Sequence, residues 1–388
     1  MSKGDGDVDV AADEVIVWQD ANERCVLPWQ SPGGVPAPRR VRVADDTMTA
    51  DAAYRFACEG TALLWRGDFQ NARQLLQALG RRLDRKTRPG TVAGAAFPEA
   101  FHRKRMAQAQ RARILGMLLI PFDAGHVVPL RRAPDVRIAC EEASGKCDQA
   151  YAMSLRELLG VIGAHEWRKK GVAIPATGGR IHAHYGVFSP VRGEYVALVD
   201  EAPLPAGASG GLAFDVGTGT GVLAAVLARR GVKRVVATDQ DARALACARD
   251  NVVRLGLADA IEVMQADLFP PGRAPLIVCN PPWVPGKPSS ALEFAVYDPD
   301  SRMLKGFLAG LAGHLEPGGE GWLILSDLAE RLRLRSRDEL LAWIGQSGLI
   351  VLGRHDTRPT HAKATDPDDP LHEARAAEVT SLWRLGIA

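Results

Sequence analysis

Residues 212–230 read LAFDVGTGTGVLAAVLARR, and this stretch decides the fold class. The apolar run Leu212–Val216 predicts a buried strand, and Val222–Arg230 predicts a helix. The three glycines between them allow a tight turn and let the backbone approach a ligand closely. The amino end of the helix would offer free N–H groups to an anionic part of that ligand. The stretch therefore predicts a strand, a turn and a helix of an α/β protein, with a binding site at the turn.

The alternation of strands and helices continues toward the carboxyl end of the chain. Further apolar runs predict strands at 234–238, 261–265, 276–279, 322–325, 349–354 and 379–385. Helical periodicity predicts helices at 242–255, 302–315 and 338–344. This pattern is typical of a doubly wound, mostly parallel sheet, here with seven strands. No helix separates the last two strands, which suggests an antiparallel strand inserted at one edge.

The chain divides into three segments. Residues 1–45 are rich in Asp, Pro and Gly and predict a disordered or loosely packed tail. Residues 46–180 predict a mainly helical domain, which we expect to recognise the substrate. Its helices are expected over 49–86, 98–119 and about 149–169, with an N-cap at Thr49. Residues 181–388 hold the α/β pattern.

Composition sets few limits on function. The net charge of +2 over 388 residues says nothing about partners. Basic residues gather between Arg81 and Arg113, where they could dock nucleic acid or an acidic protein surface, or form solvated helix faces. The chain starts without a signal sequence, and its longest apolar run, Ile114–Phe122, is too short to span a bilayer, so we expect a cytoplasmic protein with no membrane partner. His182 and His184 lack acidic or Cys partners at ligand spacing, and we expect no metal site.

Acidic residues follow the second and third strands of the α/β pattern. Asp239 closes the second strand, where a carboxylate can accept both hydroxyls of a ribose, as in NAD or an adenosyl ligand. Asp239 or Asp241 could instead cap the following helix. Asp267, after the third strand, could meet the amino group of an adenine or simply occupy a turn. Residues 219–224 also satisfy the G-x-G-x-x-[GA] dinucleotide fingerprint, so an NAD-dependent oxidoreductase is one interpretation.

Asn280-Pro281-Pro282-Trp283 follows the fourth strand and indicates chemistry on a planar NH2 group. Such a nitrogen is a poor nucleophile because its lone pair is delocalised. The side-chain oxygen of Asn280 and the carbonyl of Pro281 can accept both of its hydrogens, which favours pyramidalisation and directs the lone pair at a methyl donor. The prolines hold these acceptors in place, and Trp283 offers a flat face for stacking. A Pro-Pro loop without function is the alternative.

Four features stand in order at successive strand ends: the glycine turn, Asp239, Asp267 and the Asn-Pro-Pro-Trp tetrapeptide. With this arrangement the chain resembles the class I S-adenosylmethionine-dependent methyltransferases. Over residues 181–388 it is similar to the small-domain group that contains HemK-type protein-glutamine N5-methyltransferases, and its tetrapeptide looks like that of N6-adenine DNA and guanine-N2 rRNA methyltransferases. The resemblance implies S-adenosyl-L-methionine as cofactor, with Asp215 and the glycines at its methionine end, Asp239 at the ribose and Asp267 at the adenine. The implied catalytic residues are Asn280, Pro281, Pro282 and Trp283. The implied cofactor residues are Asp215, Gly217, Thr218, Gly219, Gly221, Asp239, Asp267, Leu268 and Asn280.

The resemblance defines the substrate less well than the cofactor. Val187-Phe188-Ser189-Pro190 resembles the segment before the cofactor turn in HemK-type enzymes, which favours a glutamine side-chain amide in a protein of the translation apparatus. Those enzymes carry an acid–Thr pair where this chain reads Val191-Arg192-Gly193-Glu194, and mostly Tyr in place of Trp283. A base amino group in RNA or DNA, adenine N6 or guanine N2, is therefore the alternative. The expected partner is a macromolecular substrate, protein or RNA.

Overall fold

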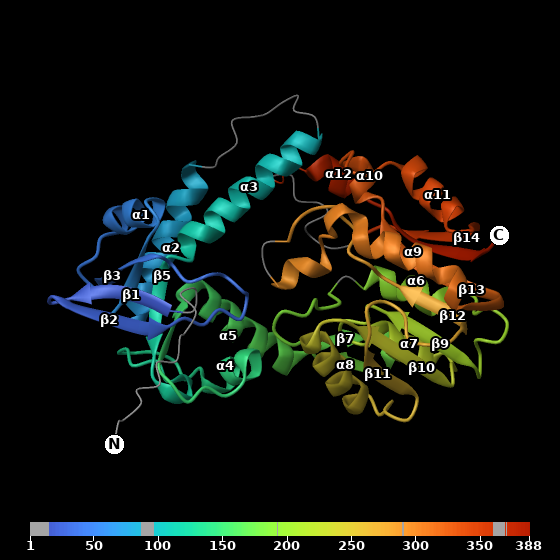
Figure 1. Ribbon diagram of the computed structural model, residues 1–388, viewed down its shortest axis with the longest axis horizontal. Coiled ribbons are helices and arrows are strands. Elements are labelled where there is room, and N and C mark those ends of the chain that lie inside the picture. Colours follow the sequence, from blue (N-terminus) through green and yellow to red (C-terminus); the bar gives the residue numbers. More distant parts are fainter. Residues whose placement is uncertain (1–14, 87–96, 192, 289–290, 360–368, 370) are drawn as a thin grey trace, which may run out of the picture. The chain divides into compact units, whose positions relative to one another are not determined.

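The computed structural model describes residues 15–86, 97–191, 193–288, 291–359, 369 and 371–388. Contacts divide the chain into two compact units (Figure 1). Unit 1 comprises the residues up to Ala93 together with 105–165, and unit 2 comprises 94–104 together with 166–388. The border therefore lies at residue 165, where the sequence suggests 180, and the first turns of α3 (Phe97–Leu115) belong to unit 2.

Unit 1 is built on a four-stranded mixed sheet in the order β3-β4-β5-β6, in which only β6 is antiparallel to its neighbour. A hairpin of β1 and β2 packs beside β3. The strands are β1 (Val15–Asp20), β2 (Glu23–Pro28), β3 (Arg40–Ala44), β4 (Thr61–Trp65), β5 (Leu118–Phe122) and β6 (Tyr151–Ser154). The helices are α1 (Ala50–Cys58), α2 (Phe69–Lys86), most of α3, η1 (Ala124–His126), α4 (Arg137–Ser144) and most of α5 (Leu155–Lys170).

The prediction of a tail over 1–45 is wrong for residues 15–44, which hold β1, β2 and β3. Ile16 and Trp18 are buried against Leu64 in the core of unit 1. The apolar alternation of this short strand therefore outweighs the polar composition around it. Residues 1–14 lie outside the described part of the chain.

The prediction of a mainly helical domain misses the sheet that runs through it. β4 divides the predicted helix 49–86 into α1 and α2, β5 replaces the end of the predicted helix 98–119, and β6 precedes α5. Each of these strands is an apolar run of four or five residues, which helical periodicity does not distinguish from a helix end. The N-cap at Thr49 is confirmed, since its hydroxyl accepts from the N–H of Ala52 at 3.3 Å.

Unit 2 contains the predicted seven-stranded sheet, in the order β11-β10-β9-β12-β13-β15-β14. β15 is antiparallel to both of its neighbours, whereas the other adjacent strands are parallel, which confirms the doubly wound fold and the inserted strand. The strands are β9 (Leu212–Val216), β10 (Arg234–Asp239), β11 (Ile261–Gln265), β12 (Ala274–Cys279), β13 (Leu315–Ser326), β14 (Leu349–Thr357) and β15 (Thr380–Ile387).

Helices cover both faces of this sheet and bury its apolar side chains (Figure 1). On one face pack α6 (Glu194–Glu201), α7 (Val222–Arg229) and α8 (Ala242–Arg254). On the other pack α9 (Arg302–His314) and α11 (Arg337–Gln346). The smaller elements of unit 2 are β7 (Val172–Ile174), η2 (Pro175–Thr177), β8 (Gly179–Ile181), η3 (Ala291–Ala295), η4 (Pro299–Ser301), α10 (Leu328–Arg331) and α12 (His372–Ala376).

The longest helices of the described residues are amphipathic or strongly charged. α2 has 18 residues and α3 has 19, and both carry several arginines. Among the helices that the structure describes, none combines the length and the apolar character needed to cross a membrane.

Candidate active site

The sheet of unit 2 brings the predicted site residues to one edge. β11, β10, β9 and β12 are parallel neighbours, so their carboxyl ends lie side by side. The turn at 217–221 follows β9, Asp239 ends β10, Asp267 follows β11 and Asn280 follows β12. In open α/β sheets, ligands bind at this edge where the strand order reverses, and here that point is β9.

Asp215 lies near the end of β9, directly before the turn, and is only 1% exposed. Its Oδ2 accepts from the hydroxyl of Thr218 at 2.6 Å and from the N–H of Ala224 at 3.0 Å. Its Oδ1 is buried and has no hydrogen-bond partner among the residues that the structure describes. Burial raises the pKa of Asp215 to about 6, although the two hydrogen bonds act to lower it. A buried carboxylate oxygen without a partner fits a cationic group at the turn.

The turn after β9 requires its glycines. Gly217, Gly219 and Gly221 have φ of 73°, 54° and 80°, in the region that favours glycine. A Cβ on Gly217 would lie 2.5 Å from Cε of Met303, and one on Gly221 would lie 3.4 Å from Ala248. Among the described residues, no atom lies within 4 Å of the same position at Gly219. The turn is thus packed at both ends and open in the middle, where a ligand can approach the backbone.

Thr238 joins the loops at three strand ends, and it is a site residue that we did not predict. Its carbonyl accepts from the N–H groups of Gly217 at 2.9 Å and Thr218 at 2.8 Å. Its hydroxyl donates to the carbonyl of Leu268 at 2.5 Å. The side chain is fully buried. A threonine that directly follows the apolar residues 235–237 of β10 is the sequence signal that marks it.

Asp239 faces the glycine turn. Its Oδ2 accepts from the N–H of Gly219 at 3.1 Å, and its Oδ1 accepts from the N–H of Asp241 at 3.0 Å. The cap of α8 is Asp241, whose carboxylate accepts from the N–H of Arg243 at 2.8 Å, so the alternative that makes Asp239 the cap is wrong. Burial raises the pKa of Asp239. The carboxylate of Asp239 is therefore part of the glycine turn, where the ligand is expected to bind.

Asp267 takes no part in the hydrogen bonds that join Asp239 to the glycine turn. Its side chain is 73% exposed, and the guanidinium of Arg302 lies 4.0 Å away. The following residue, Leu268, has a φ of 73° and offers its backbone carbonyl to the site through Thr238. Leu268 thus borders the candidate cofactor site by its backbone, whereas Asp267 lies at the surface.

Asn280 and Trp283 contact one another. The indole Nε1 of Trp283 donates to Oδ1 of Asn280 at 2.8 Å. Pro281 between them is buried, and the other three residues of the tetrapeptide are half-buried. The side-chain oxygen expected to accept from a substrate therefore already accepts one hydrogen bond within the motif.

The loop after the tetrapeptide is held at both ends. The N–H of Val284 donates to the carbonyl of Val296 at 3.2 Å, and the N–H of Asp298 donates to the carbonyl of Val284 at 3.0 Å. The carboxylate of Asp298 accepts from the N–H groups of Met303 and Leu304 at 3.0 and 3.1 Å, at the start of α9. Met303 also borders the glycine turn. α9 therefore connects the tetrapeptide loop with the turn.

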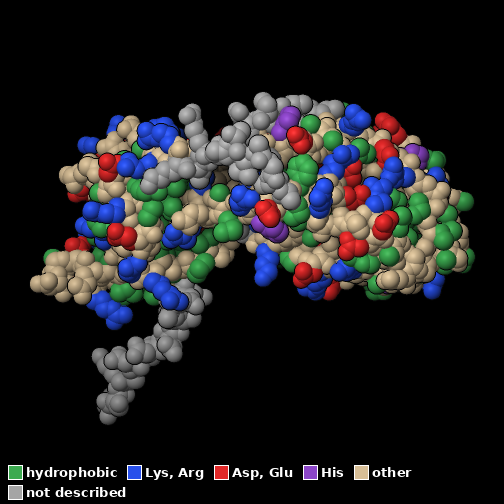
Figure 2. All heavy atoms as spheres, turned by 90° about the horizontal axis from the view of Figure 1, so that it is seen from above, with side chains coloured by type: hydrophobic (Ala, Val, Ile, Leu, Met, Phe, Trp, Pro, Cys, Tyr) green, Lys and Arg blue, Asp and Glu red, His purple; other side chains and the backbone are tan. Residues whose placement is uncertain are grey.

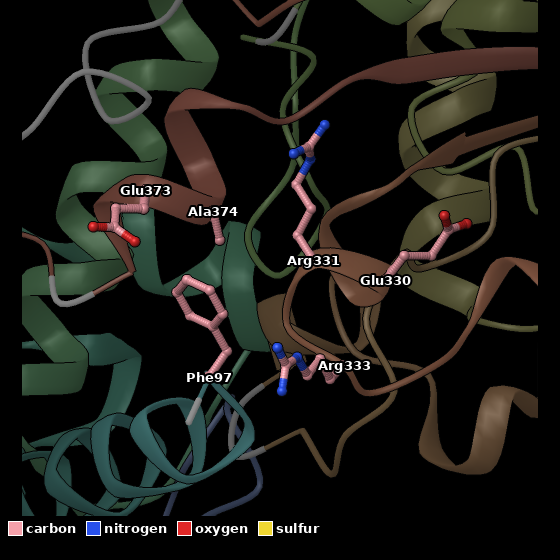
Figure 3. Close-up of a pocket in the computed structure, with 6 residues that line it drawn as sticks. All are labelled: Phe97, Glu330, Arg331, Arg333, Glu373 and Ala374. Atoms are coloured by element: carbon pink, nitrogen blue, oxygen red, sulfur yellow. The ribbon is translucent and has the colours of Figure 1, made fainter. Parts of the chain in front are cut away.

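The first turns of α3 complete this side of unit 2. Phe101 is buried in an apolar cluster with Val284, and Trp283 packs against the same cluster. A cavity of about 310 Å³ is lined by Phe97, Glu330, Arg331, Arg333, Glu373 and Ala374 (Figure 3). Two of the four charged residues on its wall are in ion pairs, Arg331 with Asp327 and Glu330 with Arg337.

The basic segment between Arg81 and Arg113 is not a row of free cations. Over the whole face that Figure 2 shows, acidic and basic side chains are interspersed, and the contacts of this segment follow from its ion pairs. Arg88 lies outside the described residues. Four of the other cations are in ion pairs: Arg82 with Asp51, Arg103 with Glu99, Lys104 with Asp369, and Arg111 with Asp84. These contacts favour ion-paired helix faces over a dedicated nucleic-acid surface.

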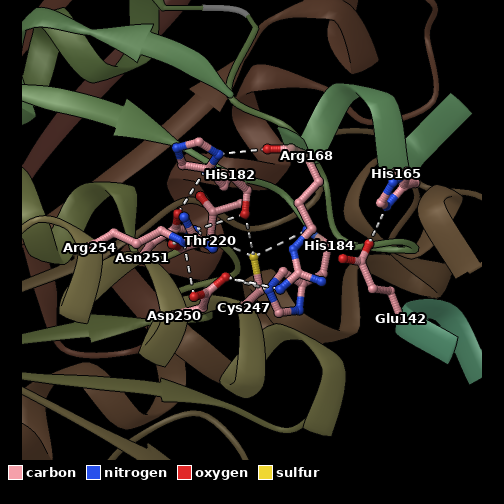
Figure 4. Close-up of polar contacts among 10 residues, drawn as sticks. All are labelled: Glu142, His165, Arg168, His182, His184, Thr220, Cys247, Asp250, Asn251 and Arg254. Carbon is pink, nitrogen blue, oxygen red and sulfur yellow. Dashed lines mark hydrogen bonds and ion pairs between the residues drawn. The ribbon is translucent and has the colours of Figure 1, made fainter. Parts of the chain in front are cut away.

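A buried hydrogen-bond network joins the turn to the segment before β9 (Figure 4). Asn251 is 1% exposed, and its Nδ2 donates to the carbonyls of Thr220 at 3.0 Å and His182 at 3.3 Å. Its Oδ1 accepts from the N–H of His182 at 2.8 Å. Nε2 of His184 lies 3.1 Å from Oδ2 of Asp250. Within the ranges that the structure describes, no group of three or more His, Cys, Asp or Glu side chains could hold a metal ion.

The known proteins to which this chain is similar are methyltransferases. The family model described as Methyltransferase small domain matches residues 178–334. A release factor glutamine methyltransferase of Gloeobacter violaceus is 30% identical over 225 residues, which cover 52% of this chain and 74% of that protein. One of Cereibacter sphaeroides is 39% identical over 111 residues, which cover 28% of this chain and 36% of that protein.

A nucleic-acid enzyme is also among the relatives. The tRNA1(Val) (adenine(37)-N6)-methyltransferase of Bacteroides thetaiotaomicron is 32% identical over 147 residues, which cover 36% of this chain and 62% of that protein. The chain thus spans less than two thirds of the Cereibacter and Bacteroides relatives. All three relatives are methyltransferases, which gives no support to the alternative of an NAD-dependent oxidoreductase.

Proposed function

The chain belongs to the class I S-adenosylmethionine-dependent methyltransferases, and we propose that it methylates a planar exocyclic NH2 group. The leading substrate is a glutamine side-chain amide in a protein of the translation apparatus. The observation that carries the proposal is the position of Asn280-Pro281-Pro282-Trp283 at the end of β12, next to the glycine turn that follows β9.

The residues at the turn fit the cofactor of this family. The buried Oδ1 of Asp215 has no hydrogen-bond partner in the described part of the chain and suits the ammonium group at the methionine end. Asp239, which already shapes the turn through Gly219, would accept the ribose hydroxyls. The backbone at Leu268 and the exposed Asp267 would border the adenine. S-adenosylmethionine supplies a methyl group on a sulfonium sulfur, which makes the carbon open to attack by a nitrogen.

The chain's own part in the reaction is to position the acceptor. Oδ1 of Asn280 and the carbonyl of Pro281 would each accept one hydrogen of the NH2 group, so that its lone pair points at the methyl carbon. The nitrogen loses its proton after it has gained the methyl group and a positive charge, so a strong general base is not required. Trp283 would form one wall of the acceptor site.

Two observations bear on the substrate. The Gloeobacter and Cereibacter relatives are named release factor glutamine methyltransferases, and the segment Val187–Pro190 resembles HemK-type enzymes, which favours a protein amide. The Bacteroides relative acts on adenine in tRNA, which keeps a base amino group as the second candidate. The ion pairs in the basic segment 81–113 weaken the case for nucleic acid.

Comparison of a deletion strain with its parent tests the proposal. Intact-mass and peptide analysis of release factors and ribosomal proteins should show one glutamine without its methyl group, while the nucleosides of tRNA and rRNA remain unchanged. Complementation with the wild-type gene should restore the methyl group, and complementation with Asn280→Ala should not. A missing methylated nucleoside with intact proteins would instead establish the base as substrate, and no change in either fraction would contradict both.

A further inference from the structure

The hydrogen bond between Trp283 and Asn280 is set by packing around the indole. The ring is half-buried and packs against three of the apolar clusters of unit 2, two of which cover opposite faces of the sheet. Two prolines restrict the backbone between the two residues. The indole N–H therefore has a fixed position, from which it donates to Oδ1 of Asn280 at 2.8 Å.

An asparagine amide has two orientations that differ in which atom points to a given neighbour. The oxygen accepts hydrogen bonds through two lone pairs, whereas the NH2 group only donates. The indole N–H of Trp283 allows only the orientation in which the oxygen of Asn280 points toward it, because the opposite orientation would place two donors against each other. One lone pair of the oxygen is then used, and one stays available for a second donor.

We propose that Trp283 is a positioning residue that holds the Asn280 amide with its oxygen, and not its NH2 group, toward the methyl acceptor. The inference rests on the proposed function, since it assigns to Asn280 the role of hydrogen-bond acceptor for the substrate. It also defines the substrate class more closely. Because one lone pair remains, Asn280 accepts a single N–H, so the site favours an acceptor with a second hydrogen that another carbonyl can accept, as a primary amide or an aminopurine has.

Trp283→Phe keeps an aromatic ring and removes the N–H donor together with part of the apolar surface of the indole. Methyl transfer from radiolabelled S-adenosylmethionine should be measured with the release-factor, ribosome and tRNA fractions of the deletion strain. Turnover should fall about three- to tenfold, as expected when one neutral hydrogen bond is lost. The dissociation constant for S-adenosylhomocysteine should stay the same, which also shows that the variant is folded. Trp343→Phe, which trims a half-buried indole of α11, is the matched control and should leave both quantities unchanged.

A double mutant separates positioning from general packing. In the Asn280→Ala background, Trp283→Phe should cause no further loss of turnover, because the group that the indole orients is gone. Additive losses would overturn the inference, as would unchanged or faster turnover in the single Trp283→Phe variant. Loss of S-adenosylhomocysteine binding in that variant would place Trp283 in the cofactor site and would overturn it equally.

An NMR measurement tests the hydrogen bond between Trp283 and Asn280 without any substrate. The indole 1H–15N signal of Trp283 is identified by its absence in the Trp283→Phe spectrum. In Asn280→Ala this signal should move upfield and exchange faster with solvent, because its acceptor has been removed. An unchanged signal would overturn the inference while leaving the proposed function untouched. If no fraction is methylated by the wild-type protein, the proposed function fails, and the signal still reports on the contact.

Discussion

Cofactor affinity should depend on pH through Asp215. The carboxyl group of Asp215 is 1% exposed, and burial raises its pKa to about 6. One of its oxygens has no hydrogen-bond partner among the described residues. The ammonium group of S-adenosylhomocysteine would bind the ionised form and would therefore lower this pKa in the complex. The affinity should accordingly be full above pH 7 and should fall as the pH drops through about 6.

The size of this effect follows from the pKa. With a value of about 6, about one tenth of the carboxyl groups are ionised at pH 5 and about nine tenths at pH 7. The dissociation constant for S-adenosylhomocysteine should thus be about tenfold larger at pH 5 than at pH 7. Near pH 6, binding should release about half a proton per protein molecule, which calorimetry in buffers of different ionisation enthalpy measures.

Two variants identify the group responsible. Asp215→Asn should bind more weakly at pH 7, and its affinity should change much less between pH 5 and 7 than that of the wild-type protein. Burial also raises the pKa of Asp239, so Asp239→Asn serves as the comparison and should retain the pH dependence assigned to Asp215. An affinity that is flat with pH in the wild-type protein, or a pH dependence that survives in Asp215→Asn, would refute the assignment of Asp215 to the ammonium group.

Three further substitutions test the remaining parts of the site. Asp239→Ala should weaken S-adenosylhomocysteine by ~1.5–3 kcal/mol in calorimetry, because charge-assisted hydrogen bonds to the ribose are lost; an unchanged affinity would remove Asp239 from the cofactor site. Asn280→Ala should lower turnover by about 100-fold or more while cofactor affinity changes little, since its side chain faces the acceptor; the reverse pattern would make Asn280 a cofactor residue. Asn251→Ala should lower the free energy of unfolding in urea by about 1–3 kcal/mol, because the buried carbonyl of Thr220 loses its donor. It should also weaken S-adenosylhomocysteine, and a stable variant with normal affinity would show that the network does not support the turn.

The seven strands of the large sheet of unit 2 could be predicted from the sequence because each contains an apolar run, whereas the short strands β7 and β8 were not predicted. β9 and β11 have the predicted bounds, Leu212–Val216 and Ile261–Gln265. β13 departs most from its prediction, since it begins at Leu315 and not at the predicted residue 322. Its first half contains a proline and several glycines, which carry no strand signal, and it is held in the sheet by pairing with β12.

Unit 1 could not be predicted in the same way because its strands are short and border helices. Thr61–Trp65 is an apolar run of five residues between two helical patterns, and only its pairing with β3 and β5 makes it a strand. Tertiary contacts of this kind are not visible in local periodicity. The same holds for the ion pairs of Arg82 and Arg111, because their partners Asp51 and Asp84 lie about 30 residues away in the chain.

The candidate site shows why strand-end position predicts a binding edge better than it predicts individual side chains. Asp239 and Asp267 occupy similar places. Asp239 ends β10, the strand beside β9, and Asp267 follows β11, one strand further out. Asp239 accepts from the N–H of Gly219 and is therefore part of the turn before any ligand arrives. Asp267 is 73% exposed, and any bond that it makes to a ligand must compete with water. The strand order places both acids at the cofactor edge of the sheet. Burial and hydrogen bonding then distinguish them: Asp239 already shapes the site, whereas Asp267 would contact the ligand only after the ligand has bound.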